Sequence, residues 1–194
     1  MAAGTPSRFA EPAFSRARLG DPFATLGFEP TFELDPFELE ARHRELSRAL
    51  HPDRYAGRPA SERQQALGRA IEVNDAARAL KNPIRRAQAL LVRLGHPVSE
   101  TSAPAANPAF LMEVMELREA LAGARAQKDL ARVRELARDV RASQNRVTDE
   151  LKQRFAAQGA DFAAIEALLG ELRYYERFLD EAGSIEDDLD GAGS

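Results

Sequence analysis

A His-Pro-Asp tripeptide, His51-Pro52-Asp53, lies between two helical patterns and strongly limits the folds open to this chain. Proline lacks an amide hydrogen and disfavours helical geometry in the residue before it, so the first helix must end there. A second helical pattern begins near Ser61, a residue well suited to cap a helix. The sequence therefore predicts two helices, one over about 36–50 and one from about 61, joined by a short loop.

The second of these helices has a stripe of small residues, which predicts close packing against the first. The stripe consists of Ala66, Ala70, Val73, Ala77 and Leu80. A further helix is predicted from Asn82-Pro83 to Gly95, after which the composition shifts to Pro, Ser and Ala. We therefore expect an N-terminal domain at 21–95 and a linker at 96–107, preceded by a disordered arm at 1–20.

Three more helical patterns follow the linker. They run from Asn107 to about Gly123, from about Asp129 to Gln158 and from about Asp161 to Asp180. Short turns between helices favour antiparallel neighbours, so we expect a three-helix bundle over 108–182. The acidic, glycine-containing end at 183–194 is expected to form a flexible tail. No segment has the alternation typical of a strand, and the predicted fold class is all-α.

The composition narrows the possible functions. A net charge of −4 argues against a protein that chiefly binds nucleic acid, and no apolar run is long enough to span a membrane. The absence of cysteine excludes disulfides and thiolate metal sites, and the three histidines, His43, His51 and His96, are isolated from one another. We expect no metal and no cofactor, and the cytoplasm is the expected location.

An enzyme would have to use His51 and Asp53 as a general acid–base pair. These residues are two positions apart across a proline, so their side chains cannot be assumed to orient each other. No nucleophile with an obvious base partner appears in the sequence. We therefore predict a protein without catalytic activity of its own.

The helix after Asn107 has apolar residues on two faces, although a bundle helix needs only one. Its core stripe is predicted to be Phe110, Val114, Leu117 and Leu121. The residues outside that stripe are Leu111, Met112 and Met115, interleaved with Glu116, Arg118 and Glu119. In the last helix, Tyr174 likewise lies opposite the predicted core stripe. The second face either contacts a partner or packs against the N-terminal domain, and periodicity alone leaves both possibilities open.

Several segments besides the His-Pro-Asp loop have the residues of one protein family. They are Val73-Asn74-Asp75-Ala76, Asn82-Pro83, Arg86-Ala87, the FLMEVMELRE segment at 110–119, and Leu172-Arg173-Tyr174. Together with a loop flanked by two helices, which is the signature of a J-domain, they resemble the HscB family of J-type co-chaperones over roughly residues 21–180. The resemblance implies an N-terminal J-domain, built as a helical hairpin, joined to a C-terminal antiparallel three-helix bundle.

The resemblance also implies two partners. The J-domain would bind an ATPase chaperone of the HscA/DnaK type and stimulate its ATP hydrolysis. The bundle would bind the iron–sulfur scaffold IscU and deliver it to that chaperone, which promotes cluster assembly and transfer. The scaffold-binding residues that the resemblance implies are Leu111, Met112, Met115, Glu116, Arg118, Glu119 and Tyr174.

The expected ATPase-binding residues are the tripeptide itself and three arginines near it. They are His51, Pro52, Asp53, Arg44, Arg48 and Arg54. Arg44 and Arg48 lie one helical turn apart on a line leading toward the loop, where they could attract an acidic partner. Alternatively they form ion pairs with Glu40 and Glu45 on a solvated face, which is the arrangement we expect for Arg42.

Two further functions stay open at this point. A general J-protein would hold unfolded clients on its bundle and bind exposed apolar peptides broadly. A helical adaptor that carries the tripeptide without using it would affect no ATPase.

Overall fold

The structure, a computed structural model, describes residues 20–98, 107–157, 159 and 161–191. These residues form helices and connecting turns, with no strand among them, as the all-α prediction requires. By contacts the chain divides into two compact units. Among the described residues, those of 20–30 and 34–81 form the N-terminal unit, and those of 31–33 and from 82 onward form the C-terminal unit. No helix in the described ranges is long and apolar enough to cross a membrane.

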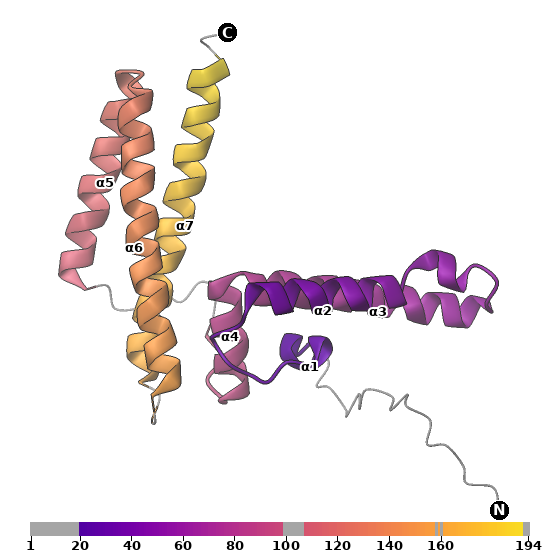
Figure 1. Ribbon diagram of the computed structural model, residues 1–194. Coiled ribbons are helices and arrows are strands. Elements are labelled where there is room, and N and C mark those ends of the chain that lie inside the picture. The colour runs from indigo at the N-terminus through magenta and orange to yellow at the C-terminus, as the bar shows by residue number, and fades with distance from the viewer. Residues whose placement is uncertain (1–19, 99–106, 158, 160, 192–194) are drawn as a thin grey trace, which may run out of the picture. The chain divides into compact units, whose positions relative to one another are not determined.

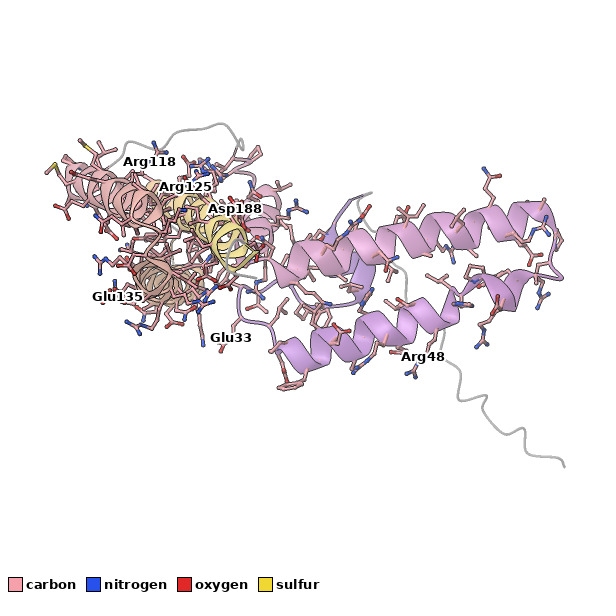
Figure 2. The ribbon with its side chains drawn as sticks, turned by 90° about the horizontal axis from the view of Figure 1, so that it is seen from above. Glu33, Arg48, Arg118, Arg125, Glu135 and Asp188 are labelled. Atoms are coloured by element: carbon pink, nitrogen blue, oxygen red, sulfur yellow. The ribbon has the colours of Figure 1, made fainter. Side chains whose placement is uncertain are left out.

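The N-terminal unit is built around a helical hairpin. Its elements are α1 (Pro22–Leu26), α2 (Pro36–Ala49), the short 3-10 helix η1 (Pro52–Tyr55) and α3 (Ala60–Lys81). The helices α2 and α3 lie side by side, with the tripeptide loop at the end of α2 (Figures 1 and 2). The buried side chains that hold them together include Phe23, Leu26, Leu39, Ala66, Val73, Ala77 and Leu80. The predicted stripe of small residues is therefore the packing face of α3, except that Ala70 is only half-buried.

Helix α1 is fixed at both ends by named contacts. The Asp21 carboxylate accepts a hydrogen bond from the Phe23 amide at 3.0 Å. Gly27 ends the helix with a φ of 75°, a left-handed conformation that glycine adopts without strain. Arg42 donates from Nε to the Leu26 carbonyl at 3.0 Å and pairs with Glu45 at 2.7 Å. The ion pair expected for Arg42 is present, and the same guanidinium also holds α1 against α2.

The C-terminal unit contains four helices. They are α4 (Pro83–Arg93), α5 (Pro108–Ala126), α6 (Leu130–Ala156) and α7 (Phe162–Gly191). The last three run side by side, and α6 is antiparallel to both neighbours (Figure 1). The core of this bundle is formed by residues with little or no exposure, among them Leu121, Val133, Val140, Leu151, Ile165, Leu169 and Leu172.

Helix α4 belongs to the same unit as the bundle, so the units divide at Lys81/Asn82 instead of the predicted boundary near Gly95. Ala87 and Leu91 of α4 are fully buried. His96, just beyond α4, stacks on Phe162 of α7 with ring centroids 4.4 Å apart. A shift in composition marks a break in secondary structure, but packing partners far along the chain decide which unit a helix joins. Residues 99–106 of the predicted linker and 1–19 of the predicted arm lie outside the described residues.

Helix α7 continues to Gly191, so the predicted end near Asp180 and the predicted flexible tail from 183 are wrong for the described residues. Ala182 and Ile185 extend the buried stripe, with 0% and 3% of their surface exposed. Arg134 of α6 pairs with Asp190 at 2.9 Å. The end of α7 therefore packs on the bundle through buried side chains, and an arginine of the neighbouring helix neutralises part of its acidic charge.

A short segment between α1 and α2 belongs to the C-terminal unit. Phe32 is 4% exposed and stacks on Phe155 of α6 with ring centroids 5.3 Å apart. The guanidinium of Arg86, on α4, lies 4.9 Å from the centre of the same ring. Glu33 pairs with Lys152 of α6. Phe32 is therefore a core residue of the C-terminal unit, although the helices of that unit begin only some fifty residues later in the chain.

Candidate functional site

The tripeptide loop exposes both of its polar side chains. His51 is extended, with φ −61° and ψ 134°, and Pro52 begins η1 directly after it. The His51 ring nitrogen Nδ1 accepts a hydrogen bond from the Asp53 amide at 3.4 Å. The side chains of His51 and Asp53 are 58% and 90% exposed. The carboxylate of Asp53 is thus available to a partner, as an acceptor that a guanidinium can bind through two hydrogen bonds.

An open groove beside this loop is rich in arginine. It has a volume of about 700 Å³ and is lined by Ala41, Arg44, Glu45, Arg48, Ala49, Arg54, Tyr55 and Arg58, a set that we call the arginine groove. The structure thereby brings together the three arginines predicted for ATPase binding. Arg48 projects from α2 on the side away from α3 (Figure 2).

The ion pairs that would have explained Arg44 and Arg48 are absent from the described residues. Glu40 pairs with Lys81 of α3, whose hydrogen bond and charge lower the pKa of that carboxyl. Glu45 pairs with Arg42 instead. Both carboxylates proposed as partners are therefore paired with other cations, and Arg44 acts on Glu40 only through its charge, which also lowers the pKa of that carboxyl.

Arg58 is the residue of this groove that the sequence analysis missed. It follows η1, and its amide donates to the Tyr55 carbonyl at 3.0 Å in the turn that leads into α3. The signal that could have found it is its spacing of four residues from Arg54, which is a helical spacing within a segment that looked like an irregular loop.

On α5, the predicted second face is exposed. Leu111, Met112 and Met115 are 49%, 59% and 66% exposed. Glu116, Arg118 and Glu119 are exposed as well. At about 100° per residue these six side chains cover roughly half the circumference of the helix. We call this set the α5 surface. Adjacent exposed apolar side chains ringed by charges are typical of a surface that binds another protein.

Tyr174 does not belong to this exposed surface, and the prediction that it faces away from the core is wrong. It is 7% exposed, and its hydroxyl donates to the Val114 carbonyl of α5 at 3.2 Å. Its ring meets Phe110 edge to face at 5.7 Å. Burial raises the pKa of the Tyr174 phenol, an effect that the nearby Arg118 partly offsets. Tyr174 therefore holds α5 against α7 from beneath the α5 surface.

A second tyrosine lies in a polar cluster between the three bundle helices. The Tyr175 hydroxyl donates to Glu113 of α5 at 3.0 Å. Burial and this hydrogen bond raise the pKa of Tyr175 far above its ordinary range. Burial also raises the pKa of Glu171, and the negative charges of Glu113 and Glu150 raise it further. Carboxylates from α5, α6 and α7 therefore repel one another in this part of the bundle.

This repulsion predicts a pH-dependent stability of the C-terminal unit. Because the folded state raises the pKa of Glu171, the stability that this group contributes is full below its unfolded pKa of about 4.3 and is lost as pH rises through the folded pKa. Glu171→Gln should therefore raise the free energy of unfolding at pH 7 and have little effect near pH 4. Urea denaturation at the two pH values measures the difference. The exposed Asp149→Asn is the matched control, and an equal gain from it would contradict the assignment.

Sequence comparison finds similarity to one family of proteins along most of the chain. Residues 106–183 match the family described as the HSCB C-terminal oligomerisation domain. A protein named co-chaperone protein HscB homolog from Neisseria meningitidis is 40% identical over 159 residues, which cover 82% of this chain and 92% of that protein.

Two solved structures have a similar fold. Chaperone HscB from Vibrio cholerae superimposes with a TM-score of 0.73 at 31% identity, over 87% of this chain and 99% of the other. The crystal structure of the human co-chaperone protein HscB gives a TM-score of 0.77 at 26% identity and covers 93% of each chain.

Proposed function

Because the chain belongs to the HscB family of co-chaperones, we propose that it stimulates an HscA/DnaK-type ATPase through its N-terminal unit and delivers an IscU-type iron–sulfur scaffold through its C-terminal unit. The observation that supports this proposal is the presence of two exposed surfaces of different chemistry on two different units. The tripeptide loop with the arginine groove is strongly cationic, whereas the α5 surface is apolar and ringed by charges.

The N-terminal unit would bind the ATPase in two ways. The arginines of the groove would attract an acidic patch on the ATPase and orient the encounter. Asp53 would then accept hydrogen bonds from an arginine of the ATPase, beside the imidazole of His51. Binding of this kind changes the hydrolysis rate only if the ATPase conformation competent for hydrolysis is bound more tightly than the other. No bond is made or broken on this chain in the proposed mechanism.

The C-terminal unit would present the scaffold to the same ATPase molecule. Leu111, Met112 and Met115 supply apolar contact area, and methionine side chains adapt readily to a partner's shape. Glu116, Arg118 and Glu119 surround them and would set the orientation. Tyr174 would act by fixing the position of α5. A scaffold held in this way has a high effective concentration at the substrate-binding site of the ATPase.

Steady-state ATP hydrolysis by an HscA-type ATPase tests the proposal, with this protein and IscU added singly and together. We expect the greatest stimulation when both are present. Stimulation that is indifferent to IscU would indicate a general J-protein instead. No stimulation in any mixture would indicate a helical adaptor and would contradict the proposal.

A double substitution tests the α5 surface separately. Met112→Ala with Met115→Ala should weaken scaffold binding about tenfold or more, because the minority of interface residues whose truncation costs more than about 1 kcal/mol lies at the centre of the contact, where we place these two side chains. Both side chains are more than half exposed, so the free energy of unfolding should change by about 0.5 kcal/mol or less. Calorimetric titration with IscU and thermal unfolding measure the two effects.

The control for that experiment is Val92→Ala on α4, an apolar side chain of the same unit that is 55% exposed but lies outside the α5 surface. It should leave scaffold affinity unchanged. A large loss of stability in the methionine variant would show that these side chains belong to the core, and would remove the basis for the assignment.

A further inference from the structure

A second hollow, separate from both proposed surfaces, lies between α4 and α7 within the C-terminal unit. It has a volume of about 240 Å³. Its lining comes from Asn82, Ile84, Arg85 and Gln88 at the start of α4 and from Arg173, Glu176 and Arg177 on α7. We call it the α4–α7 cleft. None of these residues belongs to the arginine groove or the α5 surface.

Hydrogen bonds fix the shape of this cleft. The Asn82 side chain caps α4 by accepting from the Arg85 amide at 3.0 Å. Its amide nitrogen donates to the Glu176 carboxylate of α7 at 2.9 Å, which links the two helices. Ile84 is 6% exposed and packs beneath them. The shape of the cleft is therefore fixed by the two helices, because Asn82 in its polar wall is hydrogen-bonded to both α4 and α7.

The cleft has an excess of positive charge. Three guanidinium groups line it, and its single carboxylate, Glu176, is already bonded to Asn82. Arg85 and Arg177 are exposed, and neither has an ion pair with any part of the chain that the structure describes. By contrast, three arginines of α6 are paired with carboxylates at 2.6 to 2.9 Å, namely Arg132, Arg134 and Arg154.

We propose that the α4–α7 cleft is a docking site for an acidic peptide segment of a partner protein, whose carboxylates are bound by Arg85 and Arg177. Guanidinium groups match carboxylates in geometry as well as charge. The volume is below the 300–1,000 Å³ of a typical small-molecule pocket, so the cleft fits one or two side chains of a segment that continues across the surface. The side-chain amide of Gln88 offers hydrogen bonds to such a segment.

The test uses the full chain and a fluorescein-labelled peptide of alternating Glu and Gly, with a counterpart that has Gln in place of Glu. All variants also contain Arg44→Gln and Arg48→Gln, so that the arginine groove contributes little to binding. We expect fluorescence anisotropy to show binding of the acidic peptide but not of its Gln counterpart. Adding Arg85→Gln and Arg177→Gln should weaken that binding about tenfold or more.

The matched control replaces Arg125 and Arg141, two exposed arginines of the same unit outside the cleft, with glutamine. It removes the same charge and should leave binding unchanged. Equal weakening by both pairs would show general charge attraction and overturn the proposal, as would a failure of the acidic peptide to bind. Sedimentation analysis without peptide completes the test. Self-association that is lost only in the Arg85/Arg177 pair would mean that a second copy of this chain occupies the cleft, which also overturns the proposal.

Discussion

Asp53→Asn should reduce ATPase stimulation about tenfold to a hundredfold while leaving the fold intact. The carboxylate is 90% exposed and contacts the side chain of His51 in the same loop, at 3.4 Å, so the substitution alters the loop and leaves the packing of the hairpin unchanged. Asparagine keeps the shape but presents one acceptor oxygen in place of two and has no charge. The loss of a charged hydrogen-bond pair is worth about 1.5–3 kcal/mol, which sets the expected range.

Steady-state hydrolysis with saturating IscU measures this effect. The control is Glu72→Gln, an exposed residue of α3 that removes the same charge from the same unit without touching the loop. It should stimulate as the unaltered protein does. Full stimulation by Asp53→Asn would show that the loop is not the contact that matters, even if the arginine groove still binds the ATPase.

Phe32→Ala should lower the free energy of unfolding of the C-terminal unit by about 3–5 kcal/mol, the usual cost of truncating a buried phenylalanine. The ring is 4% exposed, stacks on Phe155 and lies 4.9 Å from the guanidinium of Arg86. Its removal leaves a cavity, and it also leaves a half-buried cation without the ring that covers it. Burial already lowers the pKa of Arg86, and its Nε has no hydrogen-bond partner in the described residues.

Hydrogen exchange of the α6 and α7 amides measures this loss within the C-terminal unit alone. A global unfolding curve would not, because a chain of two units need not unfold in one step. Phe37→Ala is the control. This phenylalanine lies five positions further along the chain but is 83% exposed, so its truncation should change stability by about 0.5 kcal/mol or less. Similar effects of the two substitutions would contradict the assignment of Phe32 to the core.

The sequence predicted best those features that depend on neighbouring residues. Pro52 ends α2 for a local steric reason, and the loop lies where the tripeptide placed it. The exposure of Met112 and Met115 follows from helical periodicity against one core stripe. The positions of Arg44 and Arg48 beside the loop follow from the same geometry, because α2 is regular up to its end.

The features that the sequence did not predict depend on contacts between distant segments. Tyr174 and Tyr175 are adjacent, yet both are buried, because α7 lies against both α5 and α6 and so needs a broader apolar face than one stripe. Gly183 and the acids after it resemble a helix end. Two of these acids, Glu186 and Asp190, pair with Arg134, which lies some fifty residues earlier in the chain. The burial of Phe32 likewise depends on Phe155 and Arg86, which are far from it in the sequence.

The placement of Phe32 has a consequence for how this protein can be divided. The chain passes between its two units three times, at 30/31, 33/34 and 81/82, so no single cut in the backbone separates them. A fragment that ends at residue 95 would expose the apolar face of α4. A fragment that begins at residue 107 would lack α4 and the buried side chain of Phe32. Recombination between relatives at the linker would therefore exchange pieces of one core. Partner specificity in such a protein is expected to change by substitution on its surfaces more readily than by exchange of whole modules.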